Sequence, residues 1–213
     1  MSPSSSWPCL PPCIPTLEND VTDVTLVGMG RQPEPHKRSE LLEKAVDYVL
    51  ENGLQGLSLR PLARRLGTNA RMLIYHFESK EKLITEVLQA AQARQRALLQ
   101  GLSGGAADPY AALEAFWRWF TSPRMAPFAR LLYEVEVGAM QGQHEYRSFA
   151  RQAIHGWIGF VLQGLPGSTP AQASLIVGTI AGLLLDWLIT GEEERVNAAF
   201  GAFLEVLRKG GLA

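Results

Sequence analysis

Residues 58–77, SLRPLARRLGTNARMLIYHF, predict two short helices joined by a tight turn. Apolar side chains recur at the i, i+3, i+4 and i+7 positions from Leu59, which places them on one face of the first helix. Ser58 is expected to cap the N-terminus of that helix. Gly67 follows its last turn as a residue suited to the left-handed conformation, and Asn69 is expected to cap the second helix. Two short helices connected in this way are typical of a helix-turn-helix, which inserts its second helix into the major groove of DNA.

The charge distribution along the chain supports this interpretation. The 213 residues carry 20 Lys and Arg and 21 Asp and Glu, a formal net charge of −1 that by itself gives no indication of nucleic acid. Residues 36–100, however, contain eleven basic and seven acidic side chains, whereas residues 1–35 contain one and four. Basic side chains are therefore concentrated around the helix-turn-helix, where they would neutralise DNA phosphates.

The first 35 residues differ in composition from the rest of the chain. Residues 1–15 contain five prolines and four serines without helical or alternating periodicity, and they lack the pattern of a secretory signal. We predict a disordered extension over residues 1–35, with a native start at Met29. Cys9 and Cys13 lie in this extension without the partners of a metal site. The cysteine-free remainder is typical of a cytoplasmic protein.

From residue 36 onward the sequence predicts one helix after another, and no strand is predicted after Gly30. Apolar residues recur with helical periodicity, and Gly, Pro and Ser mark the ends of the segments. We therefore predict an all-α fold of about nine helices. A three-helix helix-turn-helix DNA-binding domain is expected over residues 36–80, and a larger effector-binding and dimerisation domain over residues 81–213. The predicted helices span residues 36–52, 59–66, 70–77, 80–100, 110–120, 124–140, 143–165, 170–191 and 192–209.

Residues 175–189 are apolar on nearly all sides, so this helix is either buried in protein or crosses a membrane. A spanning helix needs about 20 apolar residues. This segment contains Asp186 and is followed by glutamates, not by basic anchors. A helix buried within the protein or between two subunits is therefore favoured, and no membrane partner is expected.

Residues 37 to about 96 resemble the tetracycline-repressor (TetR) family of bacterial transcription regulators. The resemblance covers nearly 60 residues in the same order and spacing. The sequence departs from the family pattern at Ile74, because many members have a second aromatic residue directly before the position of Tyr75. Met72 also stands where a small residue is frequent. The matching residues are Glu51-Asn52-Gly53, Gly56-Leu57-Ser58, Leu62-Ala63-Arg64-Arg65-Leu66-Gly67, Leu73, Tyr75-His76-Phe77 and Ser79-Lys80-Glu81-Lys82-Leu83.

The resemblance implies a homodimer that binds a near-palindromic double-stranded DNA operator, acts as a repressor and is released by a small-molecule effector. The helix of residues 80–100 would link effector binding to the spacing of the two recognition helices. The last two helices would form the dimer contact. The side chains expected in that contact are Leu175, Ile176, Leu183, Trp187, Val196, Phe200, Phe203 and Leu207.

The DNA contacts are predicted from the family positions and from side-chain chemistry. Tyr75 and Lys80 occupy positions that commonly contact phosphates in the family, and Ser58 could add a contact through a backbone amide. Base reading would fall to the start of the second helix, where Arg71 could pair bidentately with guanine and Asn69 with adenine. The complete expected set is Arg38, Ser58, Thr68, Asn69, Ala70, Arg71, Met72, Tyr75, His76 and Lys80, with Arg38 directed to a phosphate or the minor groove.

The second domain is expected to bind a hydrophobic small molecule with one polar group in an apolar cavity. Most aromatic side chains of this domain could equally fill its core. Polar side chains among apolar neighbours are sharper candidates, since an unpaired buried carboxylate is costly. The expected lining residues are Trp117, Phe120, Phe128, Tyr133, Glu136, Met140, His155, Trp157, Phe160 and Asp186. No metal and no cofactor are expected.

Two other classes of function were weighed against a DNA-binding regulator. An enzyme could use His155 with Asp186 or Glu136 as an acid–base pair, but the sequence has no phosphate-binding loop, nucleophile elbow or metal-ligand spacing, so an enzyme is not expected. The stronger alternative is a helical protein-interaction module that has lost sequence-specific DNA binding.

Overall fold

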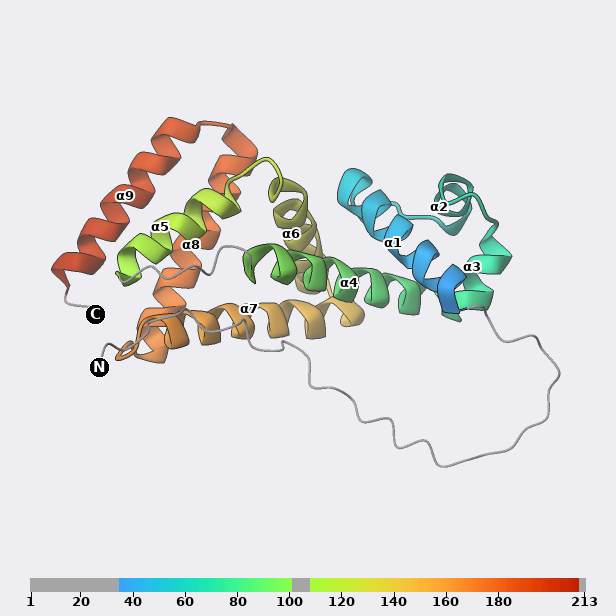
Figure 1. Ribbon diagram of the computed structural model, residues 1–213, viewed down its shortest axis with the longest axis horizontal. Coiled ribbons are helices and arrows are strands. Elements are labelled where there is room, and N and C mark those ends of the chain that lie inside the picture. The colour runs from blue at the N-terminus through green and yellow to red at the C-terminus, as the bar shows by residue number, and fades with distance from the viewer. Residues whose placement is uncertain (1–34, 101–107, 211–213) are drawn as a thin grey trace, which may run out of the picture. The chain divides into compact units, whose positions relative to one another are not determined.

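The computed structural model describes residues 35–100 and 108–210, and within these ranges the chain is all-α, as predicted (Figure 1). The predicted extension over residues 1–35 and the predicted start at Met29 fall almost entirely outside the described residues. The helices in the described ranges are α1 Pro35–Asn52, α2 Leu59–Arg65, α3 Ala70–Phe77, α4 Lys80–Gln100, α5 Pro109–Phe120, α6 Ala126–Met140, α7 His144–Gly164, α8 Pro170–Thr190 and α9 Glu193–Lys209.

The chain divides into two compact units within α4, between Ala91 and Gln92. The first unit contains α1, α2, α3 and the first part of α4, and the second contains the rest of α4 and α5 to α9. The boundary predicted after residue 80 separates a DNA-binding domain from an effector-binding domain. The division into compact units does not test which residues bind DNA or effector, so this boundary stays a prediction.

The first unit is held together by apolar side chains from all four of its helices. Burying a full-sized apolar side chain contributes about 1.5–3 kcal/mol. Helices α2 and α3 have only 7 and 8 residues, too few to be stable alone, so this packing is what keeps them helical. The largest fully buried side chains of the unit are Leu41, Val46, Val49, Leu62, Leu73, Phe77 and Leu83.

The connection between α2 and α3 follows the predicted signals except at Ser58. Gly67 has a φ of +70° and ends α2 in the left-handed conformation, as predicted. Ser58 has extended backbone before α2, but its side chain forms no capping hydrogen bond. The predicted cap is therefore wrong: Pro61 at the third helical position has no N–H to donate, and the amide of Arg60 at the second position does not form the bond either.

The second unit has one apolar core to which α5, α6, α7, α8 and α9 all contribute buried side chains. The ring of Trp117 on α5 stacks on that of Phe200 on α9, with centroids 4.7 Å apart and an interplanar angle of 10°. The indole Nε1 of Trp117 also donates a hydrogen bond of 2.8 Å to Oδ1 of Asn197. Helix α9 is thereby fixed against α5 by both packing and a directional bond.

Helix α6 begins two residues later than predicted, at Ala126. The amide of Met125 donates to the carbonyl of Ser122 at 2.9 Å, so residues 122–125 form a separate turn around Pro123.

Helix α8 has well-defined ends. Thr169 and Gln172 form a reciprocal capping box, and Gly191 ends the helix with a φ of +70°.

Helix α8 is long and apolar enough to cross a membrane, and no other helix in the described ranges is. One face of it, formed by Ala173, Ile176, Ile180 and Leu184, is nevertheless buried in the core of the second unit. Length and composition alone would fit a core helix equally well. The packing of this face therefore favours the predicted buried helix over a membrane span.

Candidate nucleic-acid interface and ligand cavity

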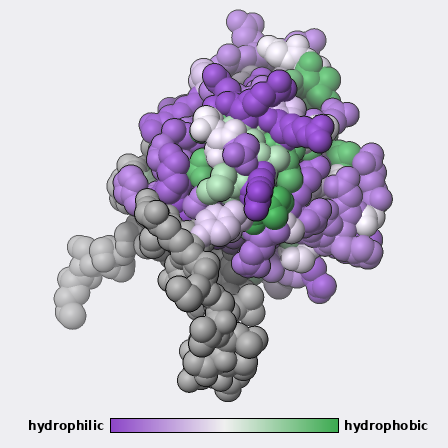
Figure 2. Space-filling view, turned by 90° about the vertical axis from the view of Figure 1, so that its right-hand side faces the viewer, coloured by the Kyte–Doolittle hydropathy of each residue, from purple (hydrophilic) through white to green (hydrophobic). Residues whose placement is uncertain are grey.

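Helix α3 exposes one face that combines cationic, apolar and phenolic side chains. Met72 and Ile74 are each 37% exposed and Tyr75 is 45% exposed, and Arg71 is also exposed. On the opposite face, Leu73 and Phe77 are completely buried. The side of the molecule on which α2 and α3 lie is mainly hydrophilic, with a small group of apolar residues (Figure 2). A short helix that presents Arg, Tyr and apolar side chains in this way has the groups needed for base edges, phosphates and thymine methyls.

Asn69 caps this helix as predicted, since its Oδ1 accepts a hydrogen bond of 2.9 Å from the amide of Met72. The same oxygen would be needed for bidentate pairing with adenine. The structure therefore gives Asn69 a positioning role at the N-terminus of α3, which uses one of the two lone pairs of this oxygen. Arg71, two residues further on, is exposed.

Arg38 does not point to DNA as predicted, but links three helices of the first unit. Its Nη2 contacts both carboxylate oxygens of Glu86 on α4, at 2.7 and 2.6 Å, and its Nε donates to the carbonyl of His76 at 3.0 Å. Its guanidinium also lies 5.0 Å from the ring centroid of Phe77. The DNA contact predicted for Arg38 is corrected accordingly, because a guanidinium that binds Glu86 and the C-terminus of α3 is already occupied.

His76 is also unavailable for a DNA contact. Its side chain is 7% exposed, and its Nδ1 has no hydrogen-bond partner in the described part of the chain. The imidazole instead packs between the rings of Tyr75 and Phe77, at centroid distances of 5.3 and 6.4 Å. The DNA contact predicted for His76 is therefore wrong, because the side chain is buried in the packing of the first unit.

The other predicted DNA-binding residues surround the exposed face of α3. Ser58 is exposed at the start of α2, while Thr68, Ala70 and Lys80 are partly exposed. Ser79 caps α4 by accepting a hydrogen bond of 3.0 Å from the amide of Lys82. This cap fixes the first turn of α4, and with it the position of Lys80.

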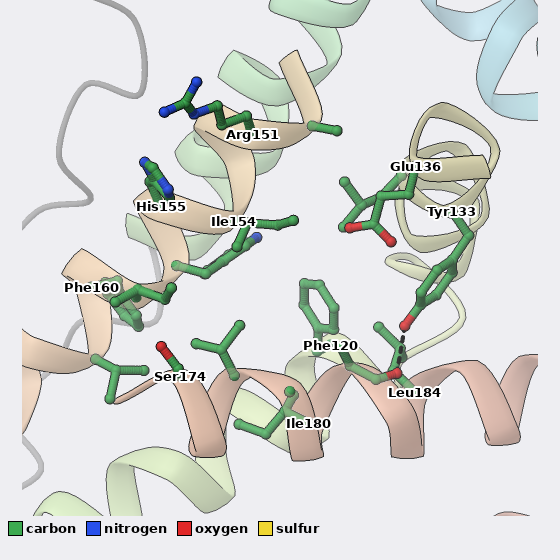
Figure 3. A pocket seen from close by; sticks show the side chains of 18 of the residues that line it. Phe120, Tyr133, Glu136, Arg151, Ile154, His155, Phe160, Ser174, Ile180 and Leu184 are labelled. Atoms are coloured by element: carbon green, nitrogen blue, oxygen red, sulfur yellow. Dashed lines mark hydrogen bonds between the residues drawn. The ribbon is translucent and has the colours of Figure 1, made fainter. Parts of the chain in front are cut away.

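The second unit contains a cavity of about 780 Å³ between α5, α6, α7 and α8 (Figure 3). This volume lies within the range of about 300–1,000 Å³ typical of small-molecule sites. Its walls are mainly apolar, and its exposed edge includes Met140 and Ile154, which are 78% and 42% exposed. The cavity is therefore large enough for an organic molecule and open to solvent on one side.

Seven of the ten predicted effector residues line this cavity. They are Phe120, Tyr133, Glu136, Met140, His155, Trp157 and Phe160. Three do not line it. Trp117 stacks on Phe200, and Phe128 is 8% exposed. Asp186 forms a bidentate ion pair with Arg195 of α9 at 2.7 and 2.8 Å, which lowers the pKa of Asp186.

The polar groups that α6 and α8 contribute to the cavity differ in how they are satisfied. The hydroxyl of Tyr133 donates to the carbonyl of Ala181 on α8 at 2.6 Å (Figure 3), and that of Ser174 donates to the carbonyl of Pro170 at 2.8 Å. Glu136 is half-buried, and no described residue donates a hydrogen bond to its carboxylate. Burial raises the pKa of Glu136, and burial together with the charge of Glu136 raises the pKa of Tyr133.

Two arginines at the edge of the cavity were not among the lining residues predicted from the sequence. Arg147 and Arg151 line it together with His155, and the three residues are spaced four apart on α7. An i, i+4, i+8 series of this kind lies along one side of a helix, and that spacing could have identified them. Neither arginine forms an ion pair within the described part of the chain, and both are exposed.

The residues predicted for the dimer contact require a larger correction. Ile176, Val196, Phe200 and Leu207 are at most 3% exposed in the core of their own subunit. Leu183, Trp187 and Phe203 pack against the same core, so only Leu175, at 59%, is well exposed. An amphipathic pattern predicts that a face is buried, but not whether its own subunit or another one buries it.

A different set of apolar residues on α8 is exposed. Leu175, Leu185 and Ile189 are 59%, 41% and 74% exposed, and Gly178 and Gly182 are exposed between them. These five residues, which we call the α8 stripe, follow each other at intervals of three and four. This spacing places them along one side of the helix.

A metal site was not expected from the sequence. Residues 35–100 and 108–210 contain no group of three or more His, Cys, Asp and Glu placed to hold an ion.

Comparison with known proteins identifies the first unit. Residues 41–87, which run from α1 into α4, match the family described as "Bacterial regulatory proteins, tetR family". The first unit therefore resembles this family over these residues. One relative is the HTH-type transcriptional repressor NicS of Pseudomonas putida, which is 28% identical over 131 residues. That alignment covers 61% of this chain and 61% of NicS, so the chain matches about three fifths of the length of this relative.

Solved structures extend the similarity to the second unit. A transcriptional regulator from Rhodococcus sp. Rha1 has a TM-score of 0.67 at 23% identity, over 81% of this chain and 96% of that chain. The multidrug binding protein EbrR, complexed with proflavin, has a TM-score of 0.60 at 24% identity, over 83% of this chain and 99% of that chain. At these identities the similarity shows that the chain shares the fold of these two proteins across both of its units.

The ion pair of Arg38 gives the first prediction. We expect Arg38→Gln and Glu86→Gln each to destabilise the protein by about 1–3 kcal/mol, because each leaves a partly buried charge unpaired. Both should weaken DNA binding by a similar factor without changing its dependence on salt. Urea unfolding and fluorescence anisotropy at several salt concentrations measure the two effects. Lys44→Gln, which breaks only an exposed pair with Glu40, should change stability by less than about 1 kcal/mol.

A phosphate contact by Arg38 would give different results. Arg38→Gln would then reduce the slope of log K against log salt by about one. Glu86→Gln would strengthen DNA binding, because it would remove a negative charge and release the guanidinium. Either result would contradict the positioning role.

Glu136 gives a prediction on pH. Its pKa is raised above the ordinary value of 4.5 in the folded protein, so the folded state binds this proton more tightly than the unfolded chain does. Its contribution to stability is therefore lost as the pH rises through the raised pKa. We expect Glu136→Gln to increase the free energy of unfolding at neutral pH and to leave it unchanged near pH 4, where the carboxyl is protonated in both states. Urea unfolding at a series of pH values measures this.

The other titratable and charged groups of the cavity, Tyr133 on α6 and Arg147, Arg151 and His155 on α7, are retained in this variant. They contribute equally to both proteins unless they are coupled to Glu136. A stability difference that does not change with pH would contradict the assignment to burial of this carboxyl.

Proposed function

We propose that this protein is a transcriptional regulator, a repressor that binds a near-palindromic DNA operator as a homodimer in the cytoplasm and is released by a small molecule. The observation that carries this proposal is the exposed face of α3, which presents Arg71, Met72, Ile74 and Tyr75 on a capped and tightly packed helix. The family match over residues 41–87 supports the same assignment.

The exposed face of α3 suggests a division of labour on DNA. The guanidinium of Arg71 can pair bidentately with the N7 and O6 of guanine, which is direct sequence reading. Met72 and Ile74 can contact thymine methyl groups, so these exposed apolar side chains would be covered when DNA is bound. The hydroxyl of Tyr75 and the ammonium of Lys80 suit phosphate oxygens, which position the helix without reading sequence.

The α8 stripe supports a homodimer. Exposed apolar surface of this extent on a soluble protein favours association. Gly178 and Gly182 are four residues apart, and a Cβ at either position would meet no atom within 4 Å in the single subunit. Small residues at this spacing allow two helices to approach closely. A two-fold dimer would place two copies of α3 on two half-sites, which is the reason for expecting a near-palindromic operator.

The cavity supports regulation by a small molecule. It has a suitable volume, mainly apolar walls and a few polar groups, which is the usual character of such sites. Among proteins with a similar fold, EbrR is described as a multidrug binding protein and was solved with proflavin. The relative NicS is described as a repressor. Release of DNA by a bound ligand is the function that unites the cavity and α3.

Selection of bound DNA from random duplexes tests this function directly. We expect enrichment of a near-palindromic site. Arg71→Ala should cost about 1–3 kcal/mol on that site and relax its sequence preference, because a base contact is lost. Tyr75→Phe should cost about 0.5–1.5 kcal/mol on the selected site and on a scrambled duplex alike, because a phosphate contact is lost. Fluorescence anisotropy on both duplexes measures these losses.

Arg118→Ala removes an exposed arginine of the second unit and serves as the control, with no expected loss on either duplex. Equal losses of the two α3 variants on both duplexes would contradict the division of labour. No enriched site, together with binding that does not depend on salt, would favour the helical protein-interaction module instead.

The α8 stripe predicts the effect of a charge at its centre. Leu185→Glu should convert the dimer to a monomer at micromolar concentration, because two carboxylates would face each other across the contact. Affinity for the full operator should fall at least about ten-fold while affinity for a half-site is retained. Sedimentation velocity and anisotropy measure the two effects. Val137→Glu on α6 changes a side chain of similar exposure, 45% against 41%, and should leave the dimer intact. A Leu185→Glu protein that remains dimeric would contradict this contact.

A further inference from the structure

The hydrogen-bond acceptors and donors of the cavity come from different helices. On the α6 and α8 walls, the hydroxyls of Tyr133 and Ser174 already donate to backbone carbonyls, so their oxygens can only accept from a ligand. The third polar group of these walls, the carboxylate of Glu136, is also an acceptor when ionised. These two walls therefore present acceptors alone.

The hydrogen-bond donors of the cavity lie on a different helix and in a different environment. Arg147, Arg151 and His155 are all on α7, and all three are exposed; the indole N–H of Trp157, also on α7, is a further donor and is the one that is partly buried. Figure 3 shows the carboxylate of Glu136 directed into the space between α6 and α7, whereas the guanidinium of Arg151 points away from it. Water screens charges at the exposed edge, but screens the half-buried carboxylate less. Glu136 is thus the charge that a bound molecule would meet inside the cavity.

An aromatic wall lines the same cavity as this carboxylate. Phe116, Phe120, Trp157 and Phe160 all line the cavity, and their rings form one connected group with centroid distances of 5.2 to 6.0 Å. Aromatic faces carry partial negative charge and attract cations. The wall and Glu136 therefore favour the same sign of charge in a ligand, while the wall also offers stacking area to a flat ring system.

We propose that the effector of this protein is an organic cation, a protonated amine or amidine on an aromatic body, whose charged group binds Glu136 while its rings stack on the aromatic wall. This inference rests on the proposed function, since it names the chemical class of the molecule that releases DNA. An organic anion would have to bring a negative charge next to a half-buried carboxylate with no protein donor between them. A cation removes the cost of leaving that carboxylate unpaired.

Three ligands with the same ring system test the charge class. Anthracen-9-ylmethylamine is a cation at neutral pH, anthracen-9-ylmethanol is neutral and anthracene-9-carboxylate is an anion. Binding to the full-length protein is measured by titration calorimetry and by quenching of tryptophan fluorescence, since Trp157 lines the cavity. We expect the amine to bind most tightly. Glu136→Gln should weaken the amine at least about ten-fold, the loss of a charge-assisted hydrogen bond, and should change the affinity of the alcohol by less than about three-fold.

Glu134→Gln is the matched control, because it removes the same charge from the same helix at a residue that does not line the cavity. It should leave the affinities of all three ligands unchanged. Tighter binding of the carboxylate than of the amine would overturn the inference, and so would an equal loss of amine and alcohol in Glu136→Gln. Failure of the amine to bind at millimolar concentration would overturn it as well.

Operator binding is measured separately, so that failure of the inference can be distinguished from failure of the proposed function. If the alcohol or the carboxylate binds and releases the selected operator, regulation by a small molecule stands and only the charge class is wrong. If a ligand binds without releasing DNA, the regulatory part of the proposed function is wrong. If no operator is selected at all, the DNA-binding part is wrong, whatever the cavity binds.

Discussion

An eight-residue helix does not persist in water without support, and the proposed DNA-binding function depends on one such helix, α3. Its N-terminus is closed by the side chain of Asn69, its inner face is buried through Leu73 and Phe77, and its C-terminal carbonyl at His76 is held by Arg38. These three constraints act at different points along the helix. Together they hold the helix from its two ends and its inner face, so that the outer face, which carries Arg71 and Tyr75, stays exposed.

Helix α8 meets a different constraint, because three of its sides have different environments. One side enters the core, a second lines the cavity, and the third, the α8 stripe, is exposed, with Gly178 belonging to both the stripe and the cavity wall. A helix with three such sides must be apolar nearly all round, which is why its composition resembles that of a membrane span. The carbonyl of Ala181, which accepts the hydroxyl of Tyr133, lies next to Gly182 of the stripe, so the cavity and the stripe meet along this helix.

Local features of this chain were predictable from sequence and tertiary ones were not. The left-handed turn at Gly67 and the cap at Asn69 depend on a few neighbouring residues and were predicted from them. The predicted cap at Ser58 does not form, and Pro61 removes one of the two amides that could have donated to it. Arg38, in contrast, is bound by Glu86, which is 48 residues away in sequence. No local pattern reveals that pairing, so Arg38 was assigned to DNA.

The same limit explains the errors in the second unit. Seven of the predicted cavity residues were found because aromatic and polar side chains are frequent in ligand sites, but Asp186 was removed from the set by a partner on α9. Val196 and Phe200 were assigned to the dimer contact because the family resemblance places it on the last two helices, and periodicity shows that a face is buried but not what buries it.

The exposed α8 stripe also affects how the stability of this protein must be described. Leu175, Leu185 and Ile189 gain free energy from burial only when a second subunit covers them. In the proposed dimer, part of the folding free energy would belong to the pair, and the melting temperature would become a function of protein concentration. At low protein concentration, dissociation and unfolding would become one coupled equilibrium, and the single subunit would be the species most exposed to proteolysis and aggregation.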